Sequence, residues 1–187
     1  TLMKQINQDI KSGNIAYNIN KPYNYVFYII AKHFGEITIK LVAFITIGGI
    51  IGNVFVGPIE HLKFANLPMI FITILLGVII NSVIRIAISI ISFWIEDSTP
   101  FHWVYDKIIL VLGTLFPIEM FPKFLRPIIQ CTPIFVVTYG PAKLLIDFSI
   151  EKFVQVFIAQ IIYLIITFAI IIFLYERGVK KLNVNGG

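Results

Sequence analysis

Residues 113–141 read GTLFPIEMFPKFLRPIIQCTPIFVVTYGP and hold five of the nine prolines of the chain. The rest of this stretch is strongly apolar, and long uncharged runs stand on both sides of it. Proline removes a backbone donor and breaks the interior of a helix. Inside a membrane, broken backbone persists only where protein or a water-filled cavity surrounds it. The stretch therefore predicts a re-entrant hairpin that faces a substrate.

The composition is that of a membrane protein. Of the 187 residues, 58% are hydrophobic and 13% are charged, and the mean hydropathy is +0.89. Soluble domains have about 45–50% apolar and about 25% charged residues. The apolar residues collect in runs near the roughly 20 residues that cross a bilayer core. We expect an all-α fold, a polytopic transmembrane helical bundle with a proline-broken re-entrant hairpin before the last span.

The apolar runs divide the chain into two parts. Residues 1–35 are polar and amphipathic, with Leu2, Ile6 and Ile10 at a spacing of four, as in a helix that lies on a membrane surface. Residues 36–187 form the expected transmembrane domain. The charge-free part of its third apolar run is long enough to cross only about half of a bilayer. We count this run and the hairpin together as one crossing. The expected spans are 36–57, 67–93, 104–118 and 153–175, with the hairpin at 113–146 and a tail at 176–187.

Basic residues set the expected topology. The tail carries Arg177, Lys180 and Lys181, which marks it as cytoplasmic by the positive-inside rule. Four crossings then place the hairpin outside and the amphipathic region 1–35 in the cytoplasm. The net charge is +5. The basic residues lie beside the apolar runs and do not form a stripe with interleaved aromatics, so we expect no nucleic-acid partner.

Two charged residues in apolar segments are candidates for a pathway. Arg85 is the only ionisable residue of the second span, and it either faces the bundle interior or extends to the interface near Trp94. Glu119 follows Pro117 in the hairpin and must be solvated or paired. Lys123, at the i+4 position, would be within reach as a partner if that turn is helical. An exit vestibule and a simple exterior ion pair both remain open for Glu119.

Motifs for nucleotide and metal chemistry are missing from the sequence. No Gly-x-x-x-x-Gly-Lys-Ser/Thr loop occurs, so ATP would be used by another polypeptide. His33 and Glu36 have the spacing of di-metal bundles but lack the repeated partners, and we expect no metal site. Four groups near the loop after the second span are either solvated interfacial charge or an acid–base site at the membrane surface. They are Glu96, Asp97, His102 and Asp106.

Short motifs follow one another in a characteristic order along almost the whole chain. They are Ile6…Ile10-Lys11-Ser12-Gly13-Asn14-Ile15, Lys21-Pro22, Phe93-Trp94, Gly113-x-x-x-Pro117, Phe121-Pro122, Pro133, Gly140-Pro141 and Arg177-Gly178…Asn185-Gly186-Gly187. This order resembles the membrane subunits of ABC-2-type exporters, the branch often labelled ABC-2 family transporter protein.

The resemblance implies an architecture. Permeases of this family usually have six spans, a cytoplasmic coupling helix between the second and third, and a broken hairpin on the outer side before the last. Residues 1–20 would then hold the coupling segment, and the four runs would be spans three to six. The first two spans would be missing, so we expect a fragment. Proteolytic processing or a chosen expression boundary would give the same start at Thr1.

The resemblance also implies partners. Two copies of the permease, or this permease and a homologous one, pair in the bilayer and dock on two ABC ATPase subunits. ATP and Mg²⁺ bind to those ATPases, so this chain needs no cofactor of its own. The expected location is the cell membrane of a prokaryote, with a cytoplasmic C-terminus.

The leading prediction is a permease subunit of an ATP-driven exporter that is not itself an enzyme. One alternative is a membrane-embedded enzyme that acts on a lipid or lipid-linked substrate without an ATPase. Another is a membrane scaffold or channel without nucleotide dependence. The expected ATPase-coupling residues are Gln8, Asp9, Ile10 and Gly13, and the expected residues of the pathway and its outer gate are Arg85, Phe116, Pro117 and Glu119.

Overall fold

The computed structural model describes residues 6, 8, 9, 12–55, 57, 63–95 and 97–185. Within these ranges the chain forms helices joined by turns, and it contains no strand. Three helical segments are long and apolar enough to cross a membrane, namely Phe27–Phe55, Phe64–Ile95 and Ile150–Lys180. The predicted fold class, an all-α polytopic helical bundle, is confirmed.

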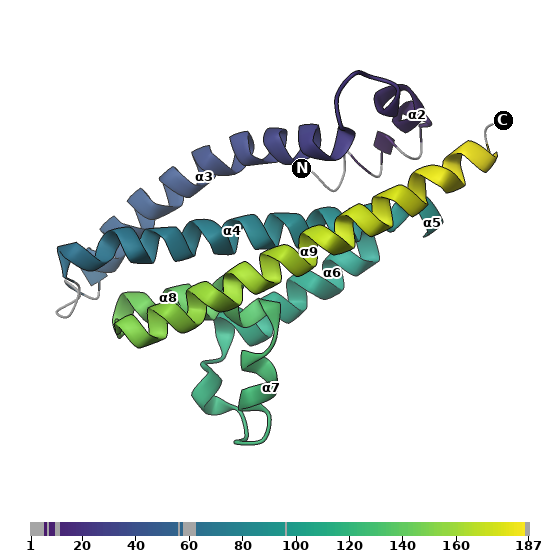
Figure 1. Cartoon of the computed structure of the whole chain (residues 1–187). Helices are drawn as coiled ribbons and strands as arrows, with labels where there is room; N and C mark the ends of the chain where they lie inside the picture. Colours follow the sequence, from purple (N-terminus) through teal and green to yellow (C-terminus); the bar gives the residue numbers. More distant parts are fainter. Residues whose placement is uncertain are drawn as a thin grey trace.

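Two long helices form the centre of the bundle. Helix α4 (Leu67–Ile90) and helix α9 (Ile150–Asn185) run side by side in the same direction (Figure 1) and share the most extensive contact between described elements. Helix α3 (Tyr25–Phe55) runs the opposite way. Helix α2 (Asn14–Ile19) and the C-terminal end of α9 therefore lie at one end of the bundle, which we call the terminal end.

Helix α4 forms where apolar residues recur at helical spacing. The short helix η1 (Phe64–Asn66) precedes it, and Pro68 stands in its first turn, where a missing N–H loses no helical hydrogen bond. Its buried residues mostly fall three or four positions apart and form one stripe. Ser82 and Ser89 lie in this stripe, and each hydroxyl donates to the carbonyl one turn earlier, at 2.7 and 3.0 Å. The stripe thus buries hydroxyl groups with their hydrogen bonds made.

Helix α3 begins at Tyr25, earlier than the residue 36 at which the sequence predicts the first span. Its first turns pack into the bundle, and Tyr25 and Ile29 are only 4% and 2% exposed. The charges of Lys32 and Glu36 interrupt the apolar run but not the helix, because both side chains lie on exposed positions. No residue in the most apolar window of α3 is buried inside the protein. Lipid or another protein must cover that part of the helix.

The helix that leads into the hairpin changes its winding. Helix α6 (Thr99–Ile108) follows the short α5 (Ser92–Ile95) and continues into a π-helical segment, η2 (Ile109–Leu115). The 10 residues of α6 and the 7 of η2 span at most about 25 Å, less than the roughly 30 Å of a bilayer core. The backbone turns extended at Phe116 (φ −111°, ψ 115°). The helix thus ends at the first proline of the hairpin, as expected for a residue before proline.

The hairpin consists of short helices that begin at prolines. Pro117 directly precedes η3, and Pro127 stands in the first turn of α7, whereas Pro141 lies inside the continuous helical segment Phe135–Ile146. A first-turn N–H has no helical partner, so proline is tolerated there. The backbone is therefore broken at Pro117 and Pro127, as the proline pattern predicts, but it continues as a helix through Pro141. The short helices are η3 (Ile118–Met120), α7 (Arg126–Gln130), the π-helical η4 (Phe135–Tyr139) and α8 (Gly140–Ile146).

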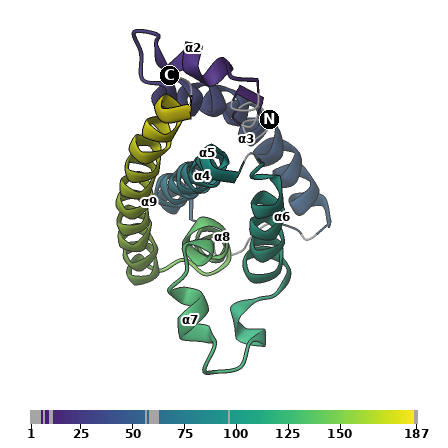
Figure 2. The same ribbon diagram turned by 90° about the vertical axis from the view of Figure 1, so that its right-hand side faces the viewer.

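Glycines allow the η4–α8 segment to lie close to its neighbours. A Cβ at Gly77 of α4 would lie 2.7 Å from the carbonyl oxygen of Val137, and a Cβ at Gly113 would collide with Thr138 Oγ1. Both positions therefore require glycine for this close approach. In the view of Figure 2, α4 lies in the middle of the bundle, and α9, α8, α6 and α3 surround it.

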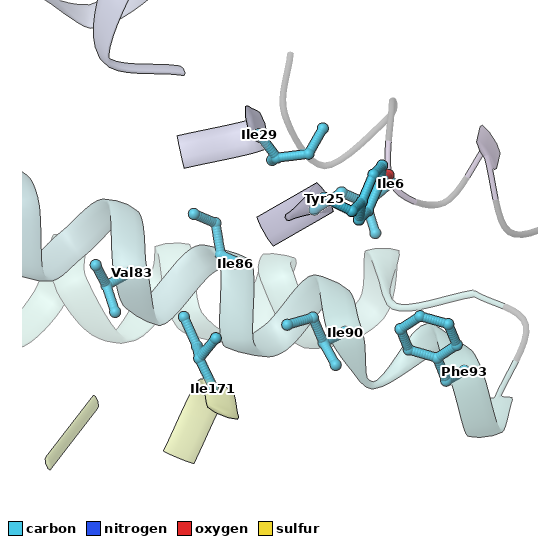
Figure 3. Packing of buried hydrophobic residues seen from close by; sticks show 8 residues of the cluster. All are labelled: Ile6, Tyr25, Ile29, Val83, Ile86, Ile90, Phe93 and Ile171. Atoms are coloured by element: carbon cyan, nitrogen blue, oxygen red, sulfur yellow. The ribbon is translucent and has the colours of Figure 1, made fainter. Parts of the chain in front are cut away.

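Two clusters of buried apolar side chains hold the bundle together. The first lies at the terminal end and joins the N-terminal segment, by which we mean the described residues 6, 8, 9, 12 and 13, with α3, α4, α5 and α9 (Figure 3). The second lies at the opposite end, which we call the hairpin end, where Ile70, Leu144 and Val156 join α4, α8 and α9. We call the first cluster the terminal core. It comprises Ile6, Tyr25, Ile29, Val83, Ile86, Ile90, Phe93 and Ile171.

Candidate functional site

The predicted site residues do not form one site. Arg85 lies within α4, whereas the hairpin residues and the N-terminal residues lie at opposite ends of the bundle. Leu2, Ile10 and Glu96 lie outside the described residues. The described candidates therefore lie in three places, namely the hairpin, the middle of α4 and the segment before α2.

Glu119 is the centre of a polar cluster in the hairpin. Its carboxylate accepts hydrogen bonds from Lys143 Nζ and Tyr139 Oη, each 2.7 Å away. Its backbone carbonyl accepts one from Arg126 Nη2 at 2.6 Å. The bonds from Lys143 and Tyr139 lower the pKa of Glu119 to about 2, and the Glu119 carboxylate raises the pKa of Lys143. Glu119 is thus a carboxylate tied to the η4–α8 segment.

The condition under which Glu119 would pair with Lys123 is not met. Residues Ile118–Met120 form a single 3-10 turn, and the backbone is extended at Phe121. A pair four positions apart requires a continuous helix, so the salt bridge forms with Lys143 of α8 instead. Both partners are well exposed, and such a pair contributes at most about 1 kcal/mol.

A pocket of about 360 Å³ lies beside this cluster, between η3, η4, α8 and α9. Buried apolar residues, among them Val136 and Leu144, form part of its lining. Phe116 and Pro117 do not line it, and the Phe116 ring packs edge-on against Phe121. Of the predicted gate residues, the structure thus brings only Glu119 to the pocket. The polar lining consists of Glu119, Gln130, Tyr139, Lys143, Lys152 and Gln155.

Arg85 points from α4 towards α6. Its Nη2 lies 2.6 Å from Asp106 Oδ1, and its guanidinium lies 5.4 Å from the centre of the Tyr105 ring. The Arg85 side chain is 22% exposed. Of the two placements that the sequence leaves open, the structure shows the one that faces the bundle. Pairing with a second charge is how membrane proteins hold an arginine within a span.

Two more polar contacts flank this ion pair. Tyr105 Oη donates to Asn81 Oδ1 at 3.0 Å, and Ser89 Oγ lies 3.0 Å from Nε2 of the fully buried His102. Asn81, Arg85 and Ser89 stand four positions apart, so they share one face of α4. We call these three contacts the α4–α6 ladder. It fastens α6 to the centre of the bundle through polar side chains.

The acidic segment after the second span is therefore mostly helix. His102 and Asp106 lie one turn apart on α6, and each contacts a different residue of α4. Asp97 stands apart from them and accepts a hydrogen bond from the Thr99 N–H at 2.9 Å. Among the residues that the structure describes, no three His, Cys, Asp or Glu side chains are placed to hold a metal ion. The helical spacing of these residues is the signal that sequence reasoning missed.

Asp9 anchors the N-terminal segment to α3. Its carboxylate accepts hydrogen bonds from Tyr25 Oη at 2.8 Å and Asn18 Nδ2 at 3.5 Å. Burial and the Asp9 bond both raise the pKa of Tyr25. Ile6, on the same segment, is buried in the terminal core. Among the described residues, the segment is thus held by the hydrogen bonds to Asp9 and by the burial of Ile6.

Gln8 and Gly13 are exposed on this segment. The Gln8 carbonyl accepts hydrogen bonds from the N–H and hydroxyl of Ser12, at 2.9 and 2.7 Å. Gly13 precedes α2 with a φ of 73°, a left-handed conformation that favours glycine. A Cβ at Gly13 would meet no described atom within 4 Å. The turn therefore needs glycine for its backbone conformation and not for space.

Gln160 is a candidate that sequence reasoning missed. It is fully buried in α9, and its Nε2 donates to the carbonyl oxygens of Thr73 in α4 and Val136 in η4, each at 2.8 Å. The Gly140 N–H, which stands four positions after Val136, donates to the carbonyl oxygen of Phe135 and not to that of Val136. The residue after that is Pro141, which has no N–H. The Gln160 amide thus supplies a donor that the helix itself lacks.

The family is shown by comparison with known proteins. A model of the ABC-2 family transporter protein matches residues 1–186. The chain belongs to this family. No curated protein and no solved structure matches it. The chain is therefore the membrane component of a transporter, and proteins of this family generally pair and work with ABC ATPases.

In this ABC-2 permease, two of the motifs that carry the resemblance meet in space. A Cβ at Gly178 of α9 would lie 2.6 Å from the Phe93 ring of α5. Phe93 also packs edge-on against Trp94 and Tyr175, with ring centroids 6.3 and 6.4 Å away. The glycine thus lets α5 close on α9 beside the terminal core. The spacing of these motifs reflects a packing contact of the permease.

Proposed function

We propose that the chain is the permease subunit of an ATP-driven exporter, and that its N-terminal segment receives the movement of a partner ABC ATPase. The observation that carries the proposal is the anchoring of that segment. Ile6 lies in the terminal core, and Asp9 is bonded to Tyr25. The terminal core also contains residues of α4 and α9. A force on the segment therefore acts on several helices at once.

The arrangement of the ends supports the expected topology. The N-terminal segment, α5 and the C-terminal end of α9 lie together (Figure 1), and basic residues follow the last span. We place this end in the cytoplasm of a prokaryotic cell, where separate ATPase subunits bind ATP and Mg²⁺. The hairpin 113–146 then lies on the outer side. A second permease subunit, identical or homologous, completes the pathway.

The mechanism is a change between two conformations. Closure of the ATPases pushes the segment around Gln8, Asp9 and Gly13, and the terminal core passes this displacement to α4 and α9. Both helices reach the hairpin end, where Gln160 bonds α9 to α4 and to η4. The hairpin therefore moves with the two central helices. Its movement opens or closes the path beside Glu119.

Asp9→Lys and Gly13→Val test the coupling. The first removes the acceptor of Tyr25, and the second forces a branched side chain into a left-handed backbone, at about 1–3 kcal/mol. We expect either variant to insert into membranes normally but to lose the stimulation of an ABC ATPase that co-purifies with the full chain. Lys123→Glu in the hairpin is the matched control and should leave the stimulation unchanged.

Unchanged ATPase stimulation in both N-terminal variants would refute the proposed coupling. Two other outcomes would favour the alternatives to an ATP-driven exporter. Turnover of a lipid or lipid-linked substrate by the purified chain without ATP would make it an enzyme. Solute passage without nucleotide dependence would make it a channel.

A further inference from the structure

The pocket beside Glu119 has the lining of a site for an anionic amphiphile. Two ammonium groups, those of Lys143 and Lys152, face it together with one carboxylate, that of Glu119. Apolar side chains complete the lining, including the buried Leu144 and Val156. The described lining therefore combines two lysines and one carboxylate with an apolar wall, and the Asp147 carboxylate pairs with Lys152 beside it.

We propose that this pocket binds a phospholipid of the bilayer, with its phosphate at Lys143 and Lys152 and the start of one acyl chain along the apolar wall. Binding at this site requires neither ATP nor a partner subunit, so it goes beyond the function proposed above. A lipid headgroup and a free phosphate would offer the same anionic group to the two lysines. The apolar wall selects a lipid over a free anion.

Lys152 lies at the start of the last predicted span. It stands in the first turn of α9 and directly precedes the uncharged run 153–175. A lysine at the end of a span places its ammonium at the level of the lipid headgroups. Phosphate is the anion found at that level, and a basic residue near a membrane surface attracts anionic lipid. The position of Lys152 thus favours a lipid phosphate as the ligand.

Both lysines retain capacity for a phosphate. An ammonium group has three N–H donors. Among the described residues, Lys143 Nζ contacts Glu119 Oε1 at 2.7 Å and Tyr139 Oη at 3.5 Å, and Lys152 Nζ contacts Asp147 Oδ2. The two lysine side chains are 39% and 44% exposed. Each ammonium therefore has at least one N–H donor that these contacts do not use.

The volume of the pocket fits part of a lipid. About 360 Å³ is near the lower limit of ligand pockets, enough for a headgroup and the start of a chain. The remainder of the chain would continue along α9. Ile162 and Ile166 follow the lining residue Ala159 by three and seven positions and are 51% and 45% exposed. They extend the apolar wall into the bilayer.

The test uses the full chain in detergent micelles with phosphatidylglycerol, and native mass spectrometry measures the lipid that is retained. We expect strong retention of phosphatidylglycerol and little of diacylglycerol with the same acyl chains. Lys143→Gln and Lys152→Gln should each weaken retention about fivefold, the equivalent of one lysine at a membrane surface. Lys152→Arg should keep it. Lys123→Gln, on the same hairpin but outside the pocket, is the control.

Glu119→Gln removes the one carboxylate of the described lining, and we expect it to strengthen retention. Weaker retention in this variant would assign Glu119 to a cationic group of the ligand and overturn the placement of the phosphate. Equal retention of diacylglycerol, or displacement of the lipid by an equimolar amount of inorganic phosphate, would overturn the lipid assignment. None of these outcomes bears on ATPase coupling, which is measured at the N-terminal segment.

Discussion

Replacement of Gln160 by leucine tests how the η4–α8 segment is held in the bundle. Leucine has nearly the same volume but donates no hydrogen bond. Loss of the bond to Thr73 O removes about 1 kcal/mol, a usual value within membranes. Val136 O is left without a donor, which costs about 1–3 kcal/mol. Because Gln160 Oε1 has no partner among the described residues, its removal offsets part of this loss.

We expect a net loss of about 2 kcal/mol in the free energy of unfolding, a factor of about thirty in the equilibrium constant. Titration of the full chain with sodium dodecyl sulfate in mixed micelles measures this quantity, and hydrogen exchange locates it. Amides of 135–146 should exchange faster in Gln160→Leu. Gln155→Leu, on an exposed position of the same helix, is the control. A loss below about 0.5 kcal/mol, or an equal loss in the control, would refute the reasoning.

Two further predictions concern charged pairs. Arg85→Gln and Asp106→Asn should each lower stability, with a coupling energy of about 1 kcal/mol in the double-mutant cycle, whereas additive effects would contradict the α4–α6 ladder. The pKa of Glu119 is lowered from 4.5 to about 2, so its bond to Lys143 stabilises the hairpin above about pH 4.5, and this contribution is lost as the pH falls towards 2. Thermal unfolding should show that loss in the native sequence and not in Glu119→Gln, and equal acid sensitivity of the two proteins would disprove it.

The long helices follow from local properties of the sequence. The uncharged run 153–175 lies within α9, and the run 67–93 lies within α4 and α5. Run length and hydropathy determine whether a helix can cross a bilayer, and both are visible without a fold. The breaks in the hairpin are equally local, because a proline such as Pro117 or Pro127 limits the helix at its own position.

The contacts between helices did not follow from such rules. Spacing arguments reach only three or four positions along one helix. Lys143 lies 24 positions from Glu119, and Gln160 donates to a carbonyl 87 positions away. Such pairs depend on the rotation of each helix and on close approaches such as that at Gly77. In the sequence, Gln160 is only an uncharged polar residue in an apolar run.

Helix α9 is the element through which the proposed coupling passes. It lines the pocket with Lys152, bonds the hairpin through Gln160, enters the terminal core with Ile171 and meets α5 at Gly178. Between its first residue and Gly178 it contains neither proline nor glycine, the residues at which helices usually kink. In the proposed mechanism, a displacement of the terminal core would tilt or shift α9 as one body. The pocket would then change with the core, because α9 contributes residues to both.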